Sequence, residues 1–396
     1  MQEPAPAQPE TCSALLEPPR ARYRRWIADR PRQVVLQPTT FCNLDCSYCY
    51  LPGRGVKTTM PLQVAEAVAR SVAELTDAGG PPVRIIWHAG EPLALGRTRF
   101  AELLAPFEPL RAAGRVQHAV QTNATLINRR WCDLFTAHGV RVGVSIDGPR
   151  ALNARRVDRA GRPAFDRILR GIDTLREHGL PFSVISVVGR ENLNAPEALL
   201  DFLASLGCRS IGLNIEEQEG VNTSRATPDL HDTVGFWARV LAWSHAHPDA
   251  PPVRELDRLG TYLRMTRDGT RPQWEDARHD PIPTVAASGD VVLLSPELAD
   301  TTAPAHDDFR AGNVLQQSLA AILADAHRLR YVAEFLTGLD NCRAGCEFFD
   351  FCRGSQAGNR YFEHGTFTAT ETAYCRSTEQ ALVLAAADTT RKDTAA

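Results

Sequence analysis

The segment Phe41-Cys42-Asn43-Leu44-Asp45-Cys46-Ser47-Tyr48-Cys49-Tyr50 follows a short apolar run at 33–37 that is predicted to be a strand. Its three cysteines lie within eight residues. Three thiolates can hold three irons of a [4Fe–4S] cube and leave the fourth iron open to a substrate. Structural zinc is the alternative, but it needs four ligands, and near this segment the sequence offers only His88 as a fourth. The segment therefore favours an iron–sulfur centre at the end of a strand.

Around this segment the sequence alternates short β-branched runs with amphipathic helical patterns. Further strands are predicted at 83–87, 117–121, 140–146, 182–188 and 209–214. Gly139, Gly179 and Gly207 stand where the intervening helices should end. Six βα units in a row predict an α/β fold whose parallel sheet has right-handed crossovers and is open or curled into a partial barrel.

The pattern changes after residue 222. Residues up to about 281 read as largely helical, and 284–294 reads as a hairpin that turns at Ser288-Gly289-Asp290. The last hundred residues are predicted to be rich in loops, and the tail after about Ala385 to be disordered. We expect five parts: an irregular tail (1–31), a barrel (32–222), a helical bridge (223–283), a cysteine-rich domain (284–380) and a C-terminal tail (381–396).

Composition excludes several classes of protein. With 43% hydrophobic and 23% charged residues among 396, the chain is typical of a globular protein. A net charge of −3 argues against a nucleic-acid or anionic-membrane partner. Residues 1–19 resemble neither a signal peptide nor a membrane span, so a cytoplasmic protein is expected. In that compartment ten cysteines favour metal ligands over disulfides.

The cysteine segment resembles the hallmark of the radical S-adenosylmethionine (SAM) superfamily, C-x3-C-x-φ-C, with Tyr48 as the aromatic residue. Four later segments resemble the SAM-binding segments of that superfamily. The resemblance implies that the SAM amino group is bound by the segment Ala89, Gly90, Glu91 and Pro92. It implies that Gln121 and Asn123 orient SAM, and that Ser145 and Asp147 contact its ribose and methionine ends. Arg156 would pair with the SAM carboxylate.

Each of these segments by itself could be a cap, a turn or a solvated loop. The segments around Glu91, Asn123 and Asp147, however, all follow predicted strands, and active sites of βα barrels are built at the carboxyl ends of the strands. The resemblance implies an oxidoreductase that takes an electron from a donor such as flavodoxin or ferredoxin. Its cluster would reduce bound SAM and release a 5′-deoxyadenosyl radical.

A second group of cysteines, Cys342, Cys346, Cys352 and Cys375, suits either a closed [4Fe–4S] cluster or zinc. The spacing resembles the SPASM domain of radical SAM enzymes that modify peptides, which implies one auxiliary [4Fe–4S] cluster. A full SPASM domain has further cysteines for a second auxiliary cluster, and Gln356 stands where one of them often falls.

Finer resemblance lies at 37–40, 214–217, 295–298, 359–363 and 370–375. These segments resemble the GrrM/OscB-type maturases, which form a cyclophane between an aromatic ring and a side-chain β-carbon of a ribosomally made precursor peptide. The alternatives are oxidation of Ser or Cys to formylglycine, as in sulfatase maturases, and a non-catalytic iron–sulfur electron carrier. Glu216 and Glu217 are candidates to accept a proton or hold the peptide; they could equally be solvated loop carboxylates.

Overall fold

The computed structural model describes residues 17–223 and 228–395, so most of the predicted N-terminal tail lies outside the described residues. In the described part, nine strands form one sheet in the order β6-β5-β4-β3-β2-β1-β7-β8-β9. The strands are β1 (Gln33–Leu36), β2 (Val83–Trp87), β3 (Val116–Thr122), β4 (Arg141–Ser145), β5 (Phe182–Val188), β6 (Ile211–Ile215), β7 (Thr284–Val285), β8 (Asp290–Val292) and β9 (Gly312–Asn313). Strands β1 to β6 are parallel, and each pairs with its neighbour in sequence. The predicted α/β fold is confirmed.

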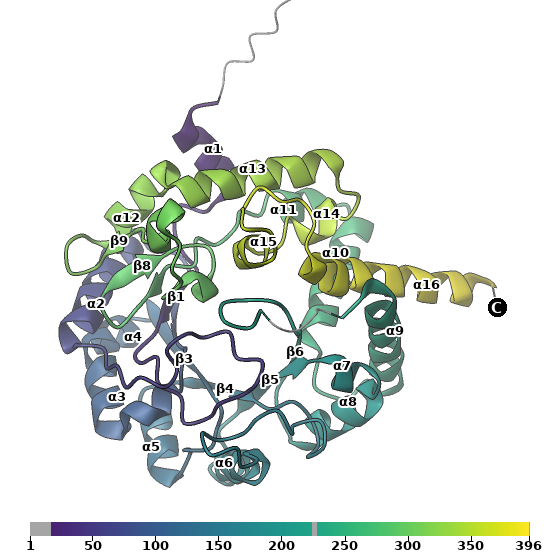
Figure 1. Ribbon diagram of the computed structural model, residues 1–396, viewed down its shortest axis with the longest axis horizontal. Helices are drawn as coiled ribbons and strands as arrows, with labels where there is room; N and C mark the ends of the chain where they lie inside the picture. Colours follow the sequence, from purple (N-terminus) through teal and green to yellow (C-terminus); the bar gives the residue numbers. More distant parts are fainter. Residues whose placement is uncertain (1–16, 224–227, 396) are drawn as a thin grey trace, which may run out of the picture.

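Helices surround the curved sheet (Figure 1). Those of the first half are α2 (Leu62–Thr76), α3 (Arg97–Leu104), α4 (Glu108–Ala112), α5 (Arg129–Ala137), α6 (Phe165–Glu177), α7 (Arg190–Leu193) and α8 (Pro196–Ser205). They bury one apolar face against the sheet, as Val64, Val68 and Val72 of α2 do. None of the described helices is long and apolar enough to cross a membrane.

Glycines end the helices where the sequence predicts it. Gly139, Gly179 and Gly207 follow α5, α6 and α8 with φ angles of +59°, +62° and +73°. Only glycine adopts this left-handed conformation without strain, and it lets the chain reverse after the helix. Each glycine returns the chain to the next strand, so that the strands of the barrel point the same way and their carboxyl ends meet at one edge of the sheet.

The N-terminal segment departs from the prediction. Residues Pro19–Trp26 form the helix α1 instead of irregular chain. Tyr23 and Trp26 are buried, and the indole Nε1 of Trp26 donates to Asp340 Oδ1 at 2.9 Å. The partner is more than three hundred residues away, so local sequence patterns could not reveal that this helix is stabilised by tertiary contacts.

The second half is more helical than predicted. The predicted bridge contains α9 (Leu230–Ala246), α10 (Arg254–Arg267) and α11 (Arg271–Glu275), and the hairpin of β7 and β8 is confirmed. The last hundred residues, expected to be mostly loop, form α12 (Leu319–Asp325), α13 (Arg330–Gly345), α14 (Phe349–Cys352), α15 (Ala357–His364) and α16 (Ala381–Ala395). The prediction of a disordered tail is wrong, because the alanine-rich start of α16 favours a helix and packs against α9.

Candidate functional site

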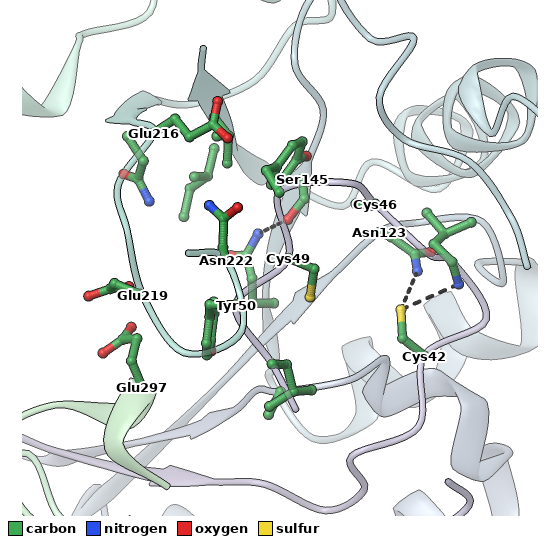
Figure 2. A pocket seen from close by; sticks show the side chains of 18 of the residues that line it. Cys42, Cys46, Cys49, Tyr50, Asn123, Ser145, Glu216, Glu219, Asn222 and Glu297 are labelled. Atoms are coloured by element: carbon green, nitrogen blue, oxygen red, sulfur yellow. Dashed lines mark hydrogen bonds between the residues drawn. The ribbon is translucent and has the colours of Figure 1, made fainter. Parts of the chain in front are cut away.

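A cavity of about 290 Å³ opens at the carboxyl edge of the sheet. Cys42, Cys46 and Cys49 line one side of it (Figure 2). Most of the predicted site residues also line it, namely Tyr48, Ala89, Gly90, Gln121, Asn123, Ser145, Arg156, Glu216 and Glu217. Glu91, Pro92 and Asp147 are not among the lining residues. The fold therefore brings segments from every strand of the barrel to one cavity.

Backbone hydrogen bonds hold the cysteine segment over the sheet. The amide of Cys42 donates to Arg54 O at 2.9 Å, and that of Asp45 donates to Val157 O at 2.8 Å. Two further donors point at the Cys42 sulfur, the Leu44 amide at 3.4 Å and Asn123 Nδ2 at 3.8 Å. Such N–H contacts stabilise cluster-bound thiolates. Burial and nearby Glu91 raise the pKa of the Cys42 thiol to about 12, so its thiolate needs the positive charge that iron supplies. These residues fit an iron–sulfur cluster.

Glu91 lies behind the cavity wall. Its carboxylate accepts from Leu93 N at 3.0 Å, Thr122 Oγ1 at 2.7 Å and Asn123 N at 2.8 Å. Burial raises its pKa to about 7. The carboxylate fixes the turn after β3, and through it the side chain of Asn123, which also donates to Asn43 at 2.9 Å.

The backbone at Ala89 is in the left-handed region, with φ +73°, and Gly90 follows with φ +54°. At Gly90 a Cβ would lie 2.4 Å from Phe41 O, so only glycine fits there. Position 89 places an alanine, which has a Cβ, in the left-handed conformation. The turn therefore keeps its geometry at a conformational cost of about 1 kcal/mol.

Replacing Ala89 with glycine is expected to relieve this strain. Ala89→Gly should raise the free energy of unfolding by about 1 kcal/mol, measured as a higher thermal midpoint under anaerobic conditions. Ala73→Gly, inside α2, is the matched control and should lower it by about the same amount, because that alanine is helical. A lower midpoint for Ala89→Gly would contradict the strain at this turn.

Tyr48, Asp147 and Arg156 form a buried group beside the cysteines. Arg156 donates through Nε and Nη2 to the two oxygens of Asp147, both at 2.8 Å, and the Tyr48 hydroxyl donates to Asp147 Oδ2 at 2.6 Å. The third guanidinium nitrogen, Nη1, has no hydrogen-bond partner among the described residues. Asp147 thus orients Arg156 at the cavity wall, where a carboxylate of a ligand could bind its guanidinium.

Gln121 and Ser145 join two neighbouring strands at the floor of the cavity. Gln121 Nε2 donates to Ser145 Oγ at 2.8 Å. The two side chains come from β3 and β4, and both were predicted from the sequence. Their mutual hydrogen bond holds two polar groups at fixed positions in the cavity.

The two predicted glutamates differ in their surroundings. Glu216 forms a paired contact with Arg155, whose Nη1 and Nη2 each donate to one carboxylate oxygen at 2.6 Å. Glu217 is half-buried and receives a hydrogen bond from Asn359. Neither is the solvated loop carboxylate that the sequence left as an alternative. Glu216 is neutralised by its partner, whereas Glu217 has no cation beside it among the described residues.

Sequence reasoning did not single out several residues that also line the cavity, among them Tyr50, Glu219, Asn222 and Glu297. The short acidic run that contains Glu216, Glu217 and Glu219 is the only signal in the sequence that could have pointed to part of this group. Glu297 lies some eighty residues further on and reaches the cavity only because β7 adds to the edge of β1.

The second cysteine group also converges. Cys342, Cys346, Cys352 and Cys375 line one small pocket, and they lie on or beside helices instead of in the predicted loops. Three donors point at three of the sulfurs: Arg360 Nη2 at 3.3 Å from Cys342, Gly354 N at 3.2 Å from Cys352, and Gln380 Nε2 at 3.5 Å from Cys375. Four thiols with N–H donors around them fit a cluster held entirely by protein.

The other described cysteines are structural. Cys132 is buried in α5, and Cys208 is buried just after α8. The nine described cysteines form no disulfide. No three His, Cys, Asp or Glu side chains in the described part are grouped as the ligands of a single metal ion would be.

Comparison with known proteins was made at the level of family, sequence and fold. Residues 36–203 match the family described as the radical SAM superfamily. An uncharacterised protein of Synechocystis sp. is 33% identical over 357 residues, which are 87% of this chain and 88% of that protein. The serine-type anaerobic sulfatase-maturating enzyme of Bacteroides thetaiotaomicron is 31% identical over 348 residues, 84% of each chain.

Solved structures show the same fold. The structure of native anSMEcpe with bound AdoMet and Kp18Cys peptide superposes with a TM-score of 0.71 at 17% identity, covering 92% of this chain and 99% of that one. Streptococcus suis SuiB bound to the precursor peptide SuiA has a TM-score of 0.61 at 17% identity, covering 85% of this chain and 74% of that one. Both similarities extend beyond the six-stranded barrel.

Proposed function

Because the chain belongs to the radical SAM superfamily and is related to anaerobic sulfatase maturases, we propose that it joins an aromatic ring to a side-chain β-carbon of a ribosomally made precursor peptide. Membership in this family makes the protein an enzyme that uses SAM and a [4Fe–4S] cluster, and its relatives are enzymes that act on peptides or proteins. The alternative of a non-catalytic electron carrier is therefore not supported.

In this proposal Cys42, Cys46 and Cys49 hold three irons of the cluster. The cluster and SAM, when bound, supply a 5′-deoxyadenosyl radical that removes a hydrogen atom from the peptide. Arg156, oriented by Asp147, binds the SAM carboxylate. Gly90, Asn123 and Ser145 complete the polar contacts to SAM. Cys342, Cys346, Cys352 and Cys375 hold one auxiliary cluster in a SPASM-like domain.

One observation supports the proposal of a crosslinking reaction: the five segments of finer resemblance lie in contact with one another in the fold. Gln37 Nε2 donates to Pro296 O at 3.4 Å, and Asn359 donates to Glu217. A Cβ at Gly358 would lie 2.6 Å from Ser295 Oγ, and Tyr374 N donates to Glu363 at 3.1 Å. The segments that resemble GrrM/OscB-type maturases, together with the adjacent Gly358, thus lie in contact, and Glu217 and Glu297 of these segments line the cavity.

Formylglycine formation is the second candidate function. It is supported by the 31% identity to the serine-type maturase of Bacteroides thetaiotaomicron, which extends over 84% of each chain. Crosslinking and the formation of formylglycine from serine each remove two hydrogen atoms from the peptide, so the mass of the product cannot separate these two reactions.

The test is to co-express the enzyme with the small peptides encoded beside its gene and analyse the products by tandem mass spectrometry. A cyclophane should lose the mass of two hydrogen atoms, resist fragmentation inside the ring and fail to couple to a hydrazide probe. Formylglycine carries an aldehyde and couples to the probe. Labelling of the product, with normal fragmentation across the modified segment, would replace the crosslinking proposal by the maturase function.

Arg156→Ala should weaken SAM binding without loss of the cluster. Removing a charge-assisted contact costs roughly 1.5–3 kcal/mol, or about ten- to a hundredfold in affinity. Equilibrium binding of SAM to the reconstituted variant measures this, and the cluster absorbance reports the integrity of the site. Arg150→Ala, which removes an exposed arginine paired with Asp166, is the matched control and should bind as the wild type does. Unchanged affinity of Arg156→Ala would contradict the proposed carboxylate contact.

A further inference from the structure

The cavity has two chemically different sides (Figure 2). The cysteine segment lies on one side, whereas Glu219 and Glu297 face each other on the opposite side, with Tyr50 and Asn222 between. Glu217 lines the same cavity. We call Glu217, Glu219, Glu297 and Asn222 the acidic wall. Its residues come from the loop after β6 and from the short helical turn Pro296–Leu298.

Glu217 and Glu297 also line a second cavity together with Arg254 and Arg258, but none of the three carboxylates forms an ion pair in the described part of the chain. Among the residues that the structure describes, no Arg, Lys or His lies within ion-pair distance of Glu217, Glu219 or Glu297. Asn359 Nδ2 donates to Glu217 and lies 3.4 Å from Glu219 Oε1, and Ser295 Oγ donates to Glu297 at 2.5 Å. The neighbouring Glu216, by contrast, is fully paired with Arg155.

Burial raises the pKa of all three carboxyl groups, that of Glu217 to about 8. Repulsion from neighbouring carboxylates raises the pKa of Glu217 and Glu219 further. Crowding desolvated carboxylates in this way is costly unless a positive charge is brought to them.

Asn222 supplies an independent observation. The side chain is 5% exposed and lines the cavity, and its Nδ2 donates to Glu217 O at 2.9 Å. Its Oδ1 is buried and has no hydrogen-bond partner among the residues that the structure describes. A buried acceptor without a donor costs free energy, and such a group points to a missing partner. The acidic wall therefore offers the cavity mainly acceptors, three carboxylates and the amide oxygen of Asn222.

We propose that the acidic wall binds the cationic side chain of an arginine in the substrate peptide, next to the residue that is modified. A guanidinium carries five N–H donors and a positive charge, which match carboxylate oxygens and the free Asn222 Oδ1. Because the same cavity holds the cysteine segment, the arginine would fix the position of the peptide relative to the proposed SAM site. This inference rests on the proposed function and names a residue of the substrate.

The test compares two pools of heptapeptides with random flanks. One pool has a fixed central arginine, and the other has citrulline, its neutral isostere, at that position. Equal amounts of both pools are incubated with immobilised holoenzyme, SAM and 0.15 M salt, which screens exposed charges. Mass spectrometry of the bound fraction should show about tenfold or greater enrichment of arginine peptides. Glu219→Gln and Glu297→Gln should reduce the enrichment to about twofold or less.

Glu74→Gln is the matched control, since it removes an exposed carboxylate on α2, and it should keep the wild-type enrichment. These isosteric changes remove charge from a crowded site, so the variants should fold. Equal binding of the two pools by the wild type would overturn the inference, as would enrichment that persists in both wall variants. Loss of SAM affinity in Glu219→Gln would assign the wall to the SAM amino group and also overturn it.

Three further measurements separate failure of this inference from failure of the proposed function. Competition by millimolar Ca²⁺ without any arginine preference would make the wall a cation site and overturn the inference. If the wild type forms the crosslinked product but shows no arginine preference, only this inference fails. If the wild type forms no 5′-deoxyadenosine, the proposed function fails first.

Discussion

Replacing Cys42, Cys46 and Cys49 together with alanine is expected to abolish formation of 5′-deoxyadenosine. The three thiolates are the only cysteine ligands on the described wall of the barrel cavity, so without them no iron is held where SAM is proposed to bind. The measurement is chromatography of reactions with SAM and dithionite under anaerobic conditions. Cleavage in the variant should fall to the rate of a blank without enzyme.

Cys132→Ala is the matched control for this triple variant. Cys132 is a buried cysteine of α5 outside both cysteine groups, and its loss should leave SAM cleavage unchanged. Persistent cleavage by the triple variant would remove the cavity as the site of SAM chemistry. Loss of cleavage in Cys132→Ala would show that the assay reports general damage to the fold.

The second large effect concerns the C-terminal cysteines. Reconstituted wild type is expected to contain about eight irons per chain, and replacing Cys342, Cys346, Cys352 and Cys375 with alanine should leave about four. Iron analysis, together with electron paramagnetic resonance of the reduced protein, measures both values. The half-buried Cys346 can be replaced alone, so that a folded variant is available if the quadruple change disrupts packing.

Zinc is the outcome that contradicts this prediction. Wild type that retains about four irons and about one zinc would have a zinc site at the second cysteine group. Cys208→Ala serves as the control, because Cys208 is buried away from both groups and should not change the metal content.

The barrel could be predicted because its signals are local. Strands β2 and β5 have the predicted bounds, and the others begin or end within two residues of them, because β-branched runs between helical patterns mark them. The glycines after α5, α6 and α8 mark the ends of the helices in the same way. The cysteine segment is equally local, since three thiols in eight residues need no tertiary information.

What the sequence did not reveal depends on contacts between distant segments. No sequence spacing predicts that Glu219 and Glu297 come together, and Asn359 of α15 contacts Glu219 across 140 residues of sequence. Helix α1 has few local signals and is held by Asp340. Helix α16 was missed for a different reason. Its polar C-terminal residues suggested disorder, although its alanine-rich start has a strong helical propensity.

The pairing of the first strand with a strand from the last third of the chain has a kinetic consequence. One edge of β1 stays unpaired until β7, some 250 residues further along the chain, has been synthesised. The hydrogen bond of Trp26 in α1 likewise cannot form before Asp340 of α13 has been synthesised. Contacts of such high sequence separation slow folding and leave a strand edge exposed meanwhile. Nascent chains that stop before residue 284 should therefore aggregate through β1, and the protein should depend on chaperones until its last hundred residues have left the ribosome.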